Sequence, residues 1–199
     1  MGEGTVVLAD RQERGRGRHG SPWISPLGGL YASLIVRKQP LLPFRAGIAV
    51  AEALCQIGVS ASLKWPNDVL VGGRKIAGIL IEAVEDWAVV GIGVNIGTAP
   101  APGATNVAAE TSVSITPEGL LELILKHFLP SLSEREVLGR YRELCDTLGY
   151  PVRMLIGKDV IEGLAVDVDP QGRLLVEDHA GRHVVSSGEC CSVRAGLST

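Results

Sequence analysis

The sequence has 199 residues, of which 46% are hydrophobic and 21% are charged, and its net charge at pH 7 is −3. This length suits one full domain plus a small one, and the composition is that of an ordinary globular protein. No global basicity indicates a nucleic-acid-binding protein, and no apolar run approaches the ~20 residues of a membrane span. We therefore expect no nucleic acid and no membrane among its partners.

Four cysteines occur, with neither a CxxC spacing nor a Cys/His metal pattern: Cys55, Cys145, Cys190 and Cys191. Cys190 and Cys191 are adjacent, which suits a disulfide framework poorly. The sequence therefore predicts free thiols in a reducing cytoplasm and no metal site. The first residues become charged too early for a secretory signal.

The first expected element is a short strand at residues 5–10, followed by an irregular segment at residues 11–23. This segment interleaves arginines with glycines: Arg11, Arg14, Arg16 and Arg18 with Gly15, Gly17 and Gly20. Glycine lets a backbone approach phosphate closely, and arginine offers a planar fork of donors to phosphate or carboxylate oxygens. One interpretation is a solvated linker or an RNA-binding RGG-like tail. The other is a lid, because the segment is tethered between two strands.

Residues 30–36 predict a buried strand, and Gly28 and Gly29 at its entrance permit either the close approach of a flat ligand or a plain turn. Apolar residues at helical spacing then predict a helix over residues 44–58 that ends at Gly58.

Residues 63–82, LKWPNDVLVGGRKIAGILIE, predict a β-hairpin that holds polar side chains beside a packed core. Two apolar, β-branched runs flank a Gly-Gly pair, which supplies the positive φ angles of a tight turn. The hairpin should gather four polar side chains: Lys64, Asn67, Asp68 and Lys75. Two cations, a carboxylate and an amide on rigid strands suit an anionic ligand, and the alternative is a surface hairpin with an ion pair.

A further strand is expected at residues 87–95, ending in Asn95. No GxGxxG fingerprint and no P-loop sequence occurs in the chain, so ATP would bind outside those folds. Two helices should follow, one over residues 120–129 and one from a capping box at Ser133 and Glu136 to Leu148.

After Gly149 the pattern changes to five short strands at 151–156, 160–168, 173–177, 182–186 and 189–194, with a type I turn at 169–172. Strands this short and close predict a small barrel of roughly fifty residues. The expected fold class is therefore α+β, with a first domain at residues 1–149 and a second at 150–199.

Five motifs follow in the order and spacing of the biotin protein ligases, which the chain resembles over nearly its whole length. They are GRGRHGSPW (15–23), GGLYASL (28–34), KWPNDVLV (64–71), KIAGILIE (75–82) and VVGIGVN (89–95). The resemblance implies a catalytic domain like the class II synthetases, with a mixed sheet and flanking helices, followed by an SH3-like β-barrel. It also implies an enzyme that activates biotin with ATP and Mg²⁺ to biotinoyl-AMP. The enzyme would then transfer biotin to one lysine of the biotin carboxyl carrier domain of acetyl-CoA carboxylase or a related carboxylase.

The resemblance also implies roles for individual residues. Lys75 would stabilise the charge that develops between carboxylate and phosphate, Arg18 would hold both groups, and Asp68 would orient the incoming lysine or the metal. The other ligand-contacting residues would be Gln12, Gly15, Arg16, Gly17, Trp23, Gly28, Gly29, Lys64, Asn67, Gly78, Ile79 and Asn95. An acyl adenylate is labile in water, so closure of residues 11–23 over it should suppress hydrolysis.

Within that set, Gln12 would line the biotin site, Trp23 would pack near adenine, and Lys64 would be a phosphate partner. Asn67 would be the polar neighbour of Asp68, and Asn95 would contact the nucleotide. The flat ring and apolar tail of biotin would lie against Gly28, Gly29, Gly78 and Ile79.

One departure from the family pattern concerns the N-terminal side. Members of the family usually begin earlier, with a Ser-Thr-Asn or similar motif that contacts the ureido group of biotin, whereas this sequence begins MGEGTVVLAD. Either the start is short, or biotin binds weakly or not at all. A missing strand would leave an exposed sheet edge that invites homodimer formation. A helix-turn-helix is absent, which argues against a DNA-binding repressor.

Two other functions stay open at this point. The first is a lipoate-type transferase, which shares the broad fold but is disfavoured by KWPND together with GRGR. The second is a truncated relative without enzymatic activity that binds a nucleotide or a carrier domain.

Overall fold

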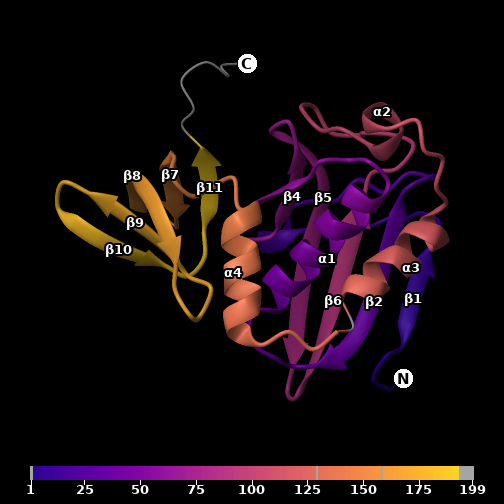
Figure 1. Cartoon of the computed structure of the whole chain (residues 1–199), viewed down its shortest axis with the longest axis horizontal. Coiled ribbons are helices and arrows are strands. Elements are labelled where there is room, and N and C mark those ends of the chain that lie inside the picture. The colour runs from indigo at the N-terminus through magenta and orange to yellow at the C-terminus, as the bar shows by residue number, and fades with distance from the viewer. Residues whose placement is uncertain (1, 129, 158, 193–199) are drawn as a thin grey trace.

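We describe the protein from a computed structural model, which covers residues 2–128, 130–157 and 159–192. Figure 1 shows a large sheet covered on one face by helices, with a smaller sheet beside it. The large sheet has the strand order β1-β2-β6-β5-β4-β3. Its strands are β1 (Val6–Ala9), β2 (Leu30–Arg37), β3 (Ser62–Lys64), β4 (Asp68–Val71), β5 (Arg74–Val84) and β6 (Trp87–Val94).

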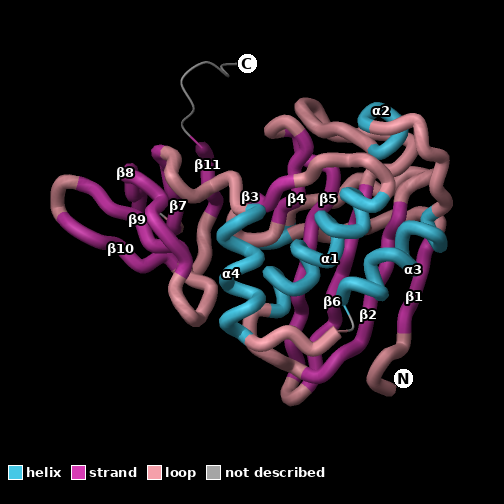
Figure 2. The backbone as a smooth tube through the Cα atoms, in the orientation of Figure 1, coloured by secondary structure: helices cyan, strands magenta, loops and turns pink. Residues whose placement is uncertain are grey.

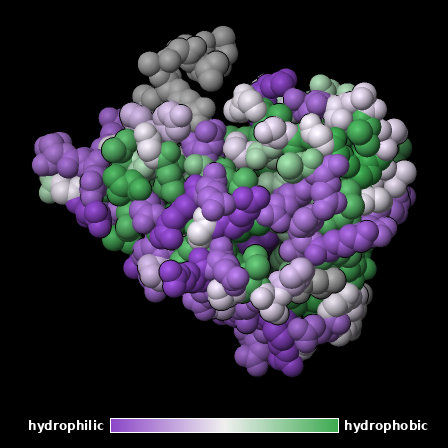
Figure 3. Space-filling model, in the orientation of Figure 1, coloured by the Kyte–Doolittle hydropathy of each residue, from purple (hydrophilic) through white to green (hydrophobic). Residues whose placement is uncertain are grey.

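Three helices lie on one face of the large sheet, as Figure 2 shows: α1 (Leu42–Gln56), α3 (Pro117–Phe128) and α4 (Glu134–Leu144). Helix α1 is buried between the sheet and the other two helices, and its small residues let the backbones approach. A Cβ on Gly47, for example, would lie 3.3 Å from a methyl group of Leu63. The solvent side of the helices is crossed by hydrophilic side chains (Figure 3), as amphipathic helices over a core require.

All strand pairs in the large sheet are antiparallel, which confirms the α+β class but corrects the expectation of a mixed sheet. Tight connections join β3 to β4, β4 to β5 and β5 to β6, and such connections give antiparallel neighbours. The crossover through α1 joins β2 to β3, which run in the same direction. However, three other strands separate them in the sheet, so these parallel strands never pair.

The three predicted helices are present, although α1 ends at Gln56 rather than at Gly58 and α3 begins at Pro117 rather than at residue 120. The capping box is present, since Ser133 Oγ accepts from the backbone N–H of Glu136, and the Glu136 carboxylate accepts from the Ser133 N–H. The helix predicted to reach Leu148 instead ends at Leu144, because Cys145 turns to an extended conformation and bridges Leu63 of edge strand β3. Residue 129, the last of the predicted helix 120–129, lies outside the described residues. Helix α2 (Val107–Glu110) was not predicted.

The small sheet has the order β10-β9-β8-β7-β11 with antiparallel pairing. Its strands are β7 (Pro151–Ile156), β8 (Asp159–Val168), β9 (Leu174–Asp178), β10 (Gly181–Val185) and β11 (Glu189–Ser192). The five predicted strands are therefore present, although residues 193–194 of the last lie outside the described part. Closure of this sheet into an SH3-like barrel stays a prediction.

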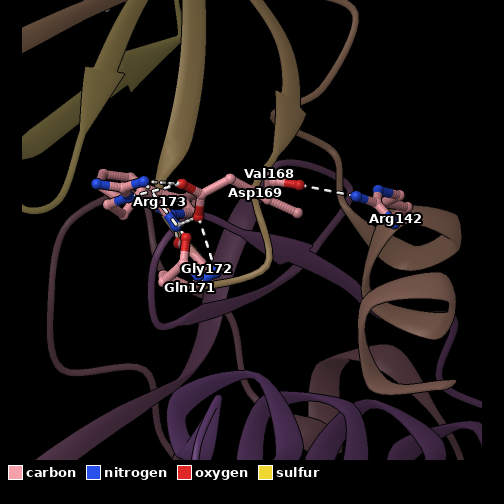
Figure 4. A network of polar contacts seen from close by, with 7 residues as sticks. Arg142, Val168, Asp169, Gln171, Gly172 and Arg173 are labelled. Carbon is pink, nitrogen blue, oxygen red and sulfur yellow. Dashed lines mark hydrogen bonds and ion pairs between the residues drawn. The ribbon is translucent and has the colours of Figure 1, made fainter. Parts of the chain in front are cut away.

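The two sheets are joined through the turn between β8 and β9. Asp169 accepts hydrogen bonds from the backbone N–H groups of Gln171 and Arg173, which fixes the turn (Figure 4). The carbonyl of Gly172 then accepts a bond of 3.0 Å from the indole N–H of Trp65, whose side chain is 2% exposed. Arg142 of α4 donates to the carbonyl of Val168 at 2.8 Å. The small sheet is thus anchored at Trp65, which lies two residues before Asn67 in the sequence.

Candidate functional site

A cavity of about 500 Å³ lies on the face of the large sheet that the helices leave open. Successive side chains of a strand point to opposite faces, and the alternate positions Val90, Ile92 and Val94 of β6 belong to the helix-covered core. Val89, Gly91 and Gly93 therefore face the cavity, with Tyr31 and Ser33 of β2 beside them. The lining also includes most of residues 12–23, three residues of the β4–β5 hairpin (Asn67, Asp68 and Lys75), residues further along β5 (Gly78, Ile79, Leu80 and Glu82) and Gly188.

The floor of the cavity is a glycine pair covered by the ring of Trp23. Gly78 of β5 and Gly93 of β6 are direct partners across the sheet. A Cβ on Gly93 would lie 2.5 Å from Nε1 of Trp23, and one on Gly78 would lie 3.1 Å from its ring. Both positions therefore need glycine for the indole to lie flat on the sheet. The Trp23 Nε1 is buried without a hydrogen-bond partner among the described residues, so an acceptor on a ligand could satisfy it.

The Arg/Gly segment is folded over this floor as an irregular hairpin. Its strands are linked by backbone bonds from Gln12 N to Ser25 O at 3.1 Å, from Gly17 N to Ser21 O at 2.7 Å and from Trp23 N to Gly15 O at 2.9 Å. A single 3₁₀ turn, Arg18–Gly20, forms its tip. This arrangement fits the lid interpretation better than a solvated linker.

Arg18 points from the lid to both sides of the site. Its NH1 group lies 3.3 Å from Oδ1 of Asn67 and 3.4 Å from the carbonyl oxygen of Gly188, which belongs to the turn before β11. Burial lowers the pKa of the Arg18 guanidinium from its ordinary value, and the negative charge of Asp68 opposes that shift. A guanidinium stays charged at neutral pH, so a partly buried one is stabilised by an anion.

Arg16, in contrast, leans across the lid towards β5. Its NH2 group lies 3.5 Å from Glu82, and both side chains are largely exposed. An exposed ion pair of this kind contributes little to stability, so it leaves Arg16 available to a ligand.

The β4–β5 hairpin places a lysine and a carboxylate against each other at the edge of the cavity. Lys75 Nζ lies 2.7 Å from Asp68 Oδ1 and 5.2 Å from the centre of the Trp23 ring. A bulge between Val69 and Leu70 shifts the register of the two strands, so Leu70 is opposite Lys75. Asn67 is held next to them, because its Nδ2 donates to the carbonyl of Ile79 at 2.6 Å. The cavity therefore combines cations, a carboxylate and an amide, as an anionic ligand requires.

Most residues that the sequence singled out are brought together. Ten of them line the cavity: Gln12, Arg16, Gly17, Arg18, Trp23, Asn67, Asp68, Lys75, Gly78 and Ile79. Gly15 lies within the lid, where a Cβ would clash with the Trp23 carbonyl oxygen and with the side chains of Ser25 and Gln12.

Four of the singled-out residues lie elsewhere. Gly28 and Gly29 border a separate small hollow with Leu8 and Pro117. Asn95 is buried, and its Nδ2 donates to the carbonyl of Thr105 at 3.0 Å. Lys64 is absent from the cavity lining and lies close enough to Cys190 for its charge to oppose the rise of that thiol's pKa. Ligand roles for these four stay predictions.

Several lining residues were not predicted: Arg14, His19, Ser21, Pro22, Tyr31, Ser33, Leu80, Glu82, Val89, Gly91, Gly93 and Gly188. Because side chains alternate between the two faces of a strand, the lining residues of β2, β5 and β6 could have been predicted once one residue of each strand was known to face the cavity. Gly188 is 170 positions from Arg18 in sequence, and no local pattern marks it.

The residues that the structure describes contain no group of three or more His, Cys, Asp or Glu side chains that could hold a metal ion. Within the same residues, no helix is long and apolar enough to cross a membrane.

Comparison with known proteins places this geometry in a family. The profile of the Biotin/lipoate A/B protein ligase family matches residues 2–98, and that of the Biotin protein ligase C terminal domain matches residues 147–191. The biotin--[acetyl-CoA-carboxylase] ligase of Paracoccus denitrificans is 33% identical over 92% of this chain and 88% of its own. That of Mycobacterium tuberculosis is 34% identical over 96% of this chain and 80% of its own.

A solved structure agrees with these sequence matches. The biotin protein ligase of Aquifex aeolicus, in complex with biotin and ATP, superposes with a TM-score of 0.86 at 32% identity. The match covers 98% of this chain and 91% of the Aquifex one. On these findings the chain belongs to the biotin protein ligase family.

Proposed function

We propose that the chain is an ATP-dependent biotin protein ligase. In the first step a carboxylate oxygen of biotin attacks the α-phosphorus of ATP, and the bond to the β-phosphate breaks to release pyrophosphate. In the second step a lysine amine attacks the carbonyl carbon of biotinoyl-AMP, loses a proton, and AMP leaves. The observation that carries the proposal is that one cavity gathers Arg18, Lys75 and Asp68 under a folded lid.

The first step brings two anions together, so its barrier falls when fixed cations face both. Lys75 enters the cavity from the hairpin, where it contacts Asp68, and Arg18 enters from the lid, where it contacts Asn67. Lys75 would stabilise the charge that develops on the phosphate, while Arg18 would hold the phosphate and the carboxylate. Asp68 would be released from Lys75 when the substrates bind and would then orient the acceptor lysine.

The remaining lining residues would shape the site for its two substrates. Ile79 and Gly78 would receive the flat ring and apolar tail of biotin once the Trp23 ring moves off the glycine floor, with Gln12 at the rim. Trp23, 5.2 Å from Lys75, would lie near adenine. Mg²⁺ would arrive with the triphosphate and screen its charge.

Several finer statements are part of the same proposal. The acceptor would be the carrier domain of acetyl-CoA carboxylase or a related carboxylase, as the names of the relatives suggest. Residues 1–149 would form the catalytic domain and 150–199 the SH3-like domain. The four cysteines that the structure describes as free support a reducing cytoplasm.

A homodimer is the last of these finer proposals. Strand β1 is an edge of the large sheet, and Val7 within it is 47% exposed. An edge strand with an exposed apolar side chain can pair with a second copy. Sedimentation of the protein with and without biotin and ATP tests this, because a monomer at every concentration and ligand state contradicts it.

Calorimetric titration of biotin, with and without MgATP, tests the activity directly. Saturable binding, with heat from adenylate formation when MgATP is present, is the expected result. Transfer is then followed by mass spectrometry on a biotin carrier domain, with lipoate as the competing substrate. A folded chain that binds no biotin would contradict the proposal, and preferential use of lipoate would favour the related transferase.

A further inference from the structure

Lys75 reaches into the cavity from the start of β5, which pairs on one edge with Leu70 and Val71 of β4 and on the other edge is held by a loop. Pairing between β5 and β6 stops at Ala77 and Val94. Beyond that point the N–H of Asn95 donates to the carbonyl of Ile76 at 2.9 Å. The N–H of Thr105 donates to the carbonyl of Lys75, also at 2.9 Å. On this edge of β5 the loop after β6 therefore replaces β6 as the backbone hydrogen-bonding partner of Lys75.

Thr105 is itself fixed on every side. It is only 2% exposed, its carbonyl accepts from Nδ2 of Asn95 at 3.0 Å, and its hydroxyl donates to the carboxylate of Glu110 at the end of α2. A buried hydroxyl without a hydrogen-bond partner destabilises the folded state, so the bond to Glu110 fixes the orientation of the Thr105 side chain.

The Glu110 carboxylate also accepts a hydrogen bond from the side chain of Arg74, the residue before Lys75. NH2 of Arg74 lies 2.8 Å from the same oxygen that receives the Thr105 hydroxyl, and the Glu110 side chain is 14% exposed. Arg74 directly precedes Lys75 on β5, so its side chain points to the opposite face of the strand. One carboxylate thus ties together the residue before Lys75 and the residue that bonds to the Lys75 carbonyl.

We propose that Glu110, through Arg74 and Thr105, is a positioning residue for Lys75. Glu110 does not line the cavity. A lysine has a flexible four-carbon stem, so the location of its ammonium depends on how firmly its backbone is held. This inference rests on the proposed function, because it assigns Lys75 to charge stabilisation during adenylation.

The positioning role predicts that loss of the Glu110 contacts changes kcat rather than KM. A charge that acts mainly on the transition state affects kcat, whereas uniform substrate binding affects KM. Loss of the network should move the Lys75 ammonium without altering the lid, the glycine floor or Trp23. A displacement of about 1 Å can cost a catalytic group on the order of a hundredfold in rate.

The test is a double-mutant cycle on adenylate formation. Wild type, Glu110→Gln, Lys75→Ala and the double variant are compared in single-turnover and steady-state assays of biotinoyl-AMP formation. We expect Glu110→Gln to lower kcat by about tenfold or more while KM for biotin and ATP stays within about twofold. In the Lys75→Ala background the same change should have no further effect, because Glu110 then has nothing to position.

A pair of variants at Thr105 gives a second, independent measurement. Thr105→Ser keeps the hydroxyl that donates to Glu110 and should retain most of the rate. Thr105→Val has nearly the same shape without the hydroxyl and should show the kcat loss of Glu110→Gln. Glu143→Gln is the matched control, because it removes an Arg–Glu pair of the same 2.8 Å length on the surface of α4.

The outcomes separate this inference from the function on which it rests. Absence of adenylate in the wild type overturns the proposed function before any variant is compared. With an active wild type, an unchanged kcat in Glu110→Gln overturns the inference. An equal loss with and without Lys75 also overturns it, because it would show that Glu110 only maintains the fold. If Glu110→Gln does not fold, the Thr105 pair decides the question by the same two criteria.

Discussion

Lys75 Nζ and Asp68 Oδ1 lie 2.7 Å apart across the β4–β5 hairpin, with the Lys75 side chain 37% exposed and that of Asp68 22% exposed. The pair is therefore formed at the edge of the cavity and can be opened by a ligand without unfolding either strand. For the adenylation proposed above, this suits a lysine that exchanges a carboxylate of the protein for the anions of its substrates.

Replacing Lys75 by Met should remove the main electrostatic contribution of the hairpin to adenylation. Loss of one preorganised charge of this kind lowers kcat by roughly 10²–10³-fold, and the affinity for biotin should change far less. Pyrophosphate release together with biotin calorimetry measures both quantities. Lys126→Met is the control, since it breaks a 2.9 Å pair with Glu122 on the surface of α3. Equal loss of rate in both variants would contradict the assignment.

The hairpin shows how much of such a site a sequence can predict. A Gly-Gly turn between two β-branched runs fixes the register, and the register places Asn67, Asp68 and Lys75 together. Lys64 follows the same pattern, yet it lies on edge strand β3 and is absent from the cavity lining. Strand periodicity predicts the face on which a side chain lies, but not how far the site extends along the sheet.

Contacts between distant segments were beyond such reasoning. The end of α4 at Leu144 depends on the bridge of Cys145 to Leu63, and the closure of the lid includes Gly188 from the turn before β11. Neither partner is marked by local composition. The mixed sheet that the family resemblance implied was likewise wrong, and only the full strand order shows that β6, β5 and β4 separate the parallel strands β2 and β3.

A methyl group on Gly93 should lift Trp23 from the floor of the cavity. The added Cβ would lie 2.5 Å from Nε1 and 2.6 Å from Cε2 of the indole, so the ring must move and the lid with it. Gly93→Ala should therefore expose the lid arginines to trypsin and weaken adenylate retention. In the control Gly91→Ala the Cβ would meet only Leu80, at 3.4 Å. Equal trypsin cleavage of the two variants would exclude a role for Trp23 in closing the lid.

Removal of the Arg18 side chain should weaken the closure of the lid over biotinoyl-AMP. The guanidinium links the lid tip to Asn67 at 3.3 Å and to Gly188 at 3.4 Å, and Ala at this position loses both contacts. We expect faster escape of biotinoyl-AMP to water, by about tenfold, because closure over a labile intermediate is what prevents its hydrolysis. Arg11→Ala makes the same charge change outside the cavity lining and serves as the control. Adenylate release at the wild-type rate in Arg18→Ala would rule out this role.

Protonation of Asp169 at acid pH should weaken the turn that anchors the small sheet to the large one. Desolvation raises the pKa of its carboxyl, but hydrogen bonds from the N–H and side chain of Arg173 and from the N–H of Gln171 outweigh this. The net result lies below the ordinary value of 3.8. A carboxyl with a lowered pKa in the folded state stabilises the protein above its unfolded pKa, and this contribution is lost as pH falls through the folded pKa.

The unfolding free energy, measured by urea denaturation from pH 2 to pH 7, tests this sign. Asp169→Asn should be less stable than wild type at neutral pH, and the difference should narrow as pH falls below about 4, where the carboxyls of the unfolded chain take up protons. Asp86→Asn is the control, because Asp86 lies in the exposed turn between β5 and β6 and accepts from Lys38 only through its backbone carbonyl. A difference between Asp169→Asn and wild type that stays constant with pH would show that the turn is held by packing around Gly172 and not by the charge of Asp169.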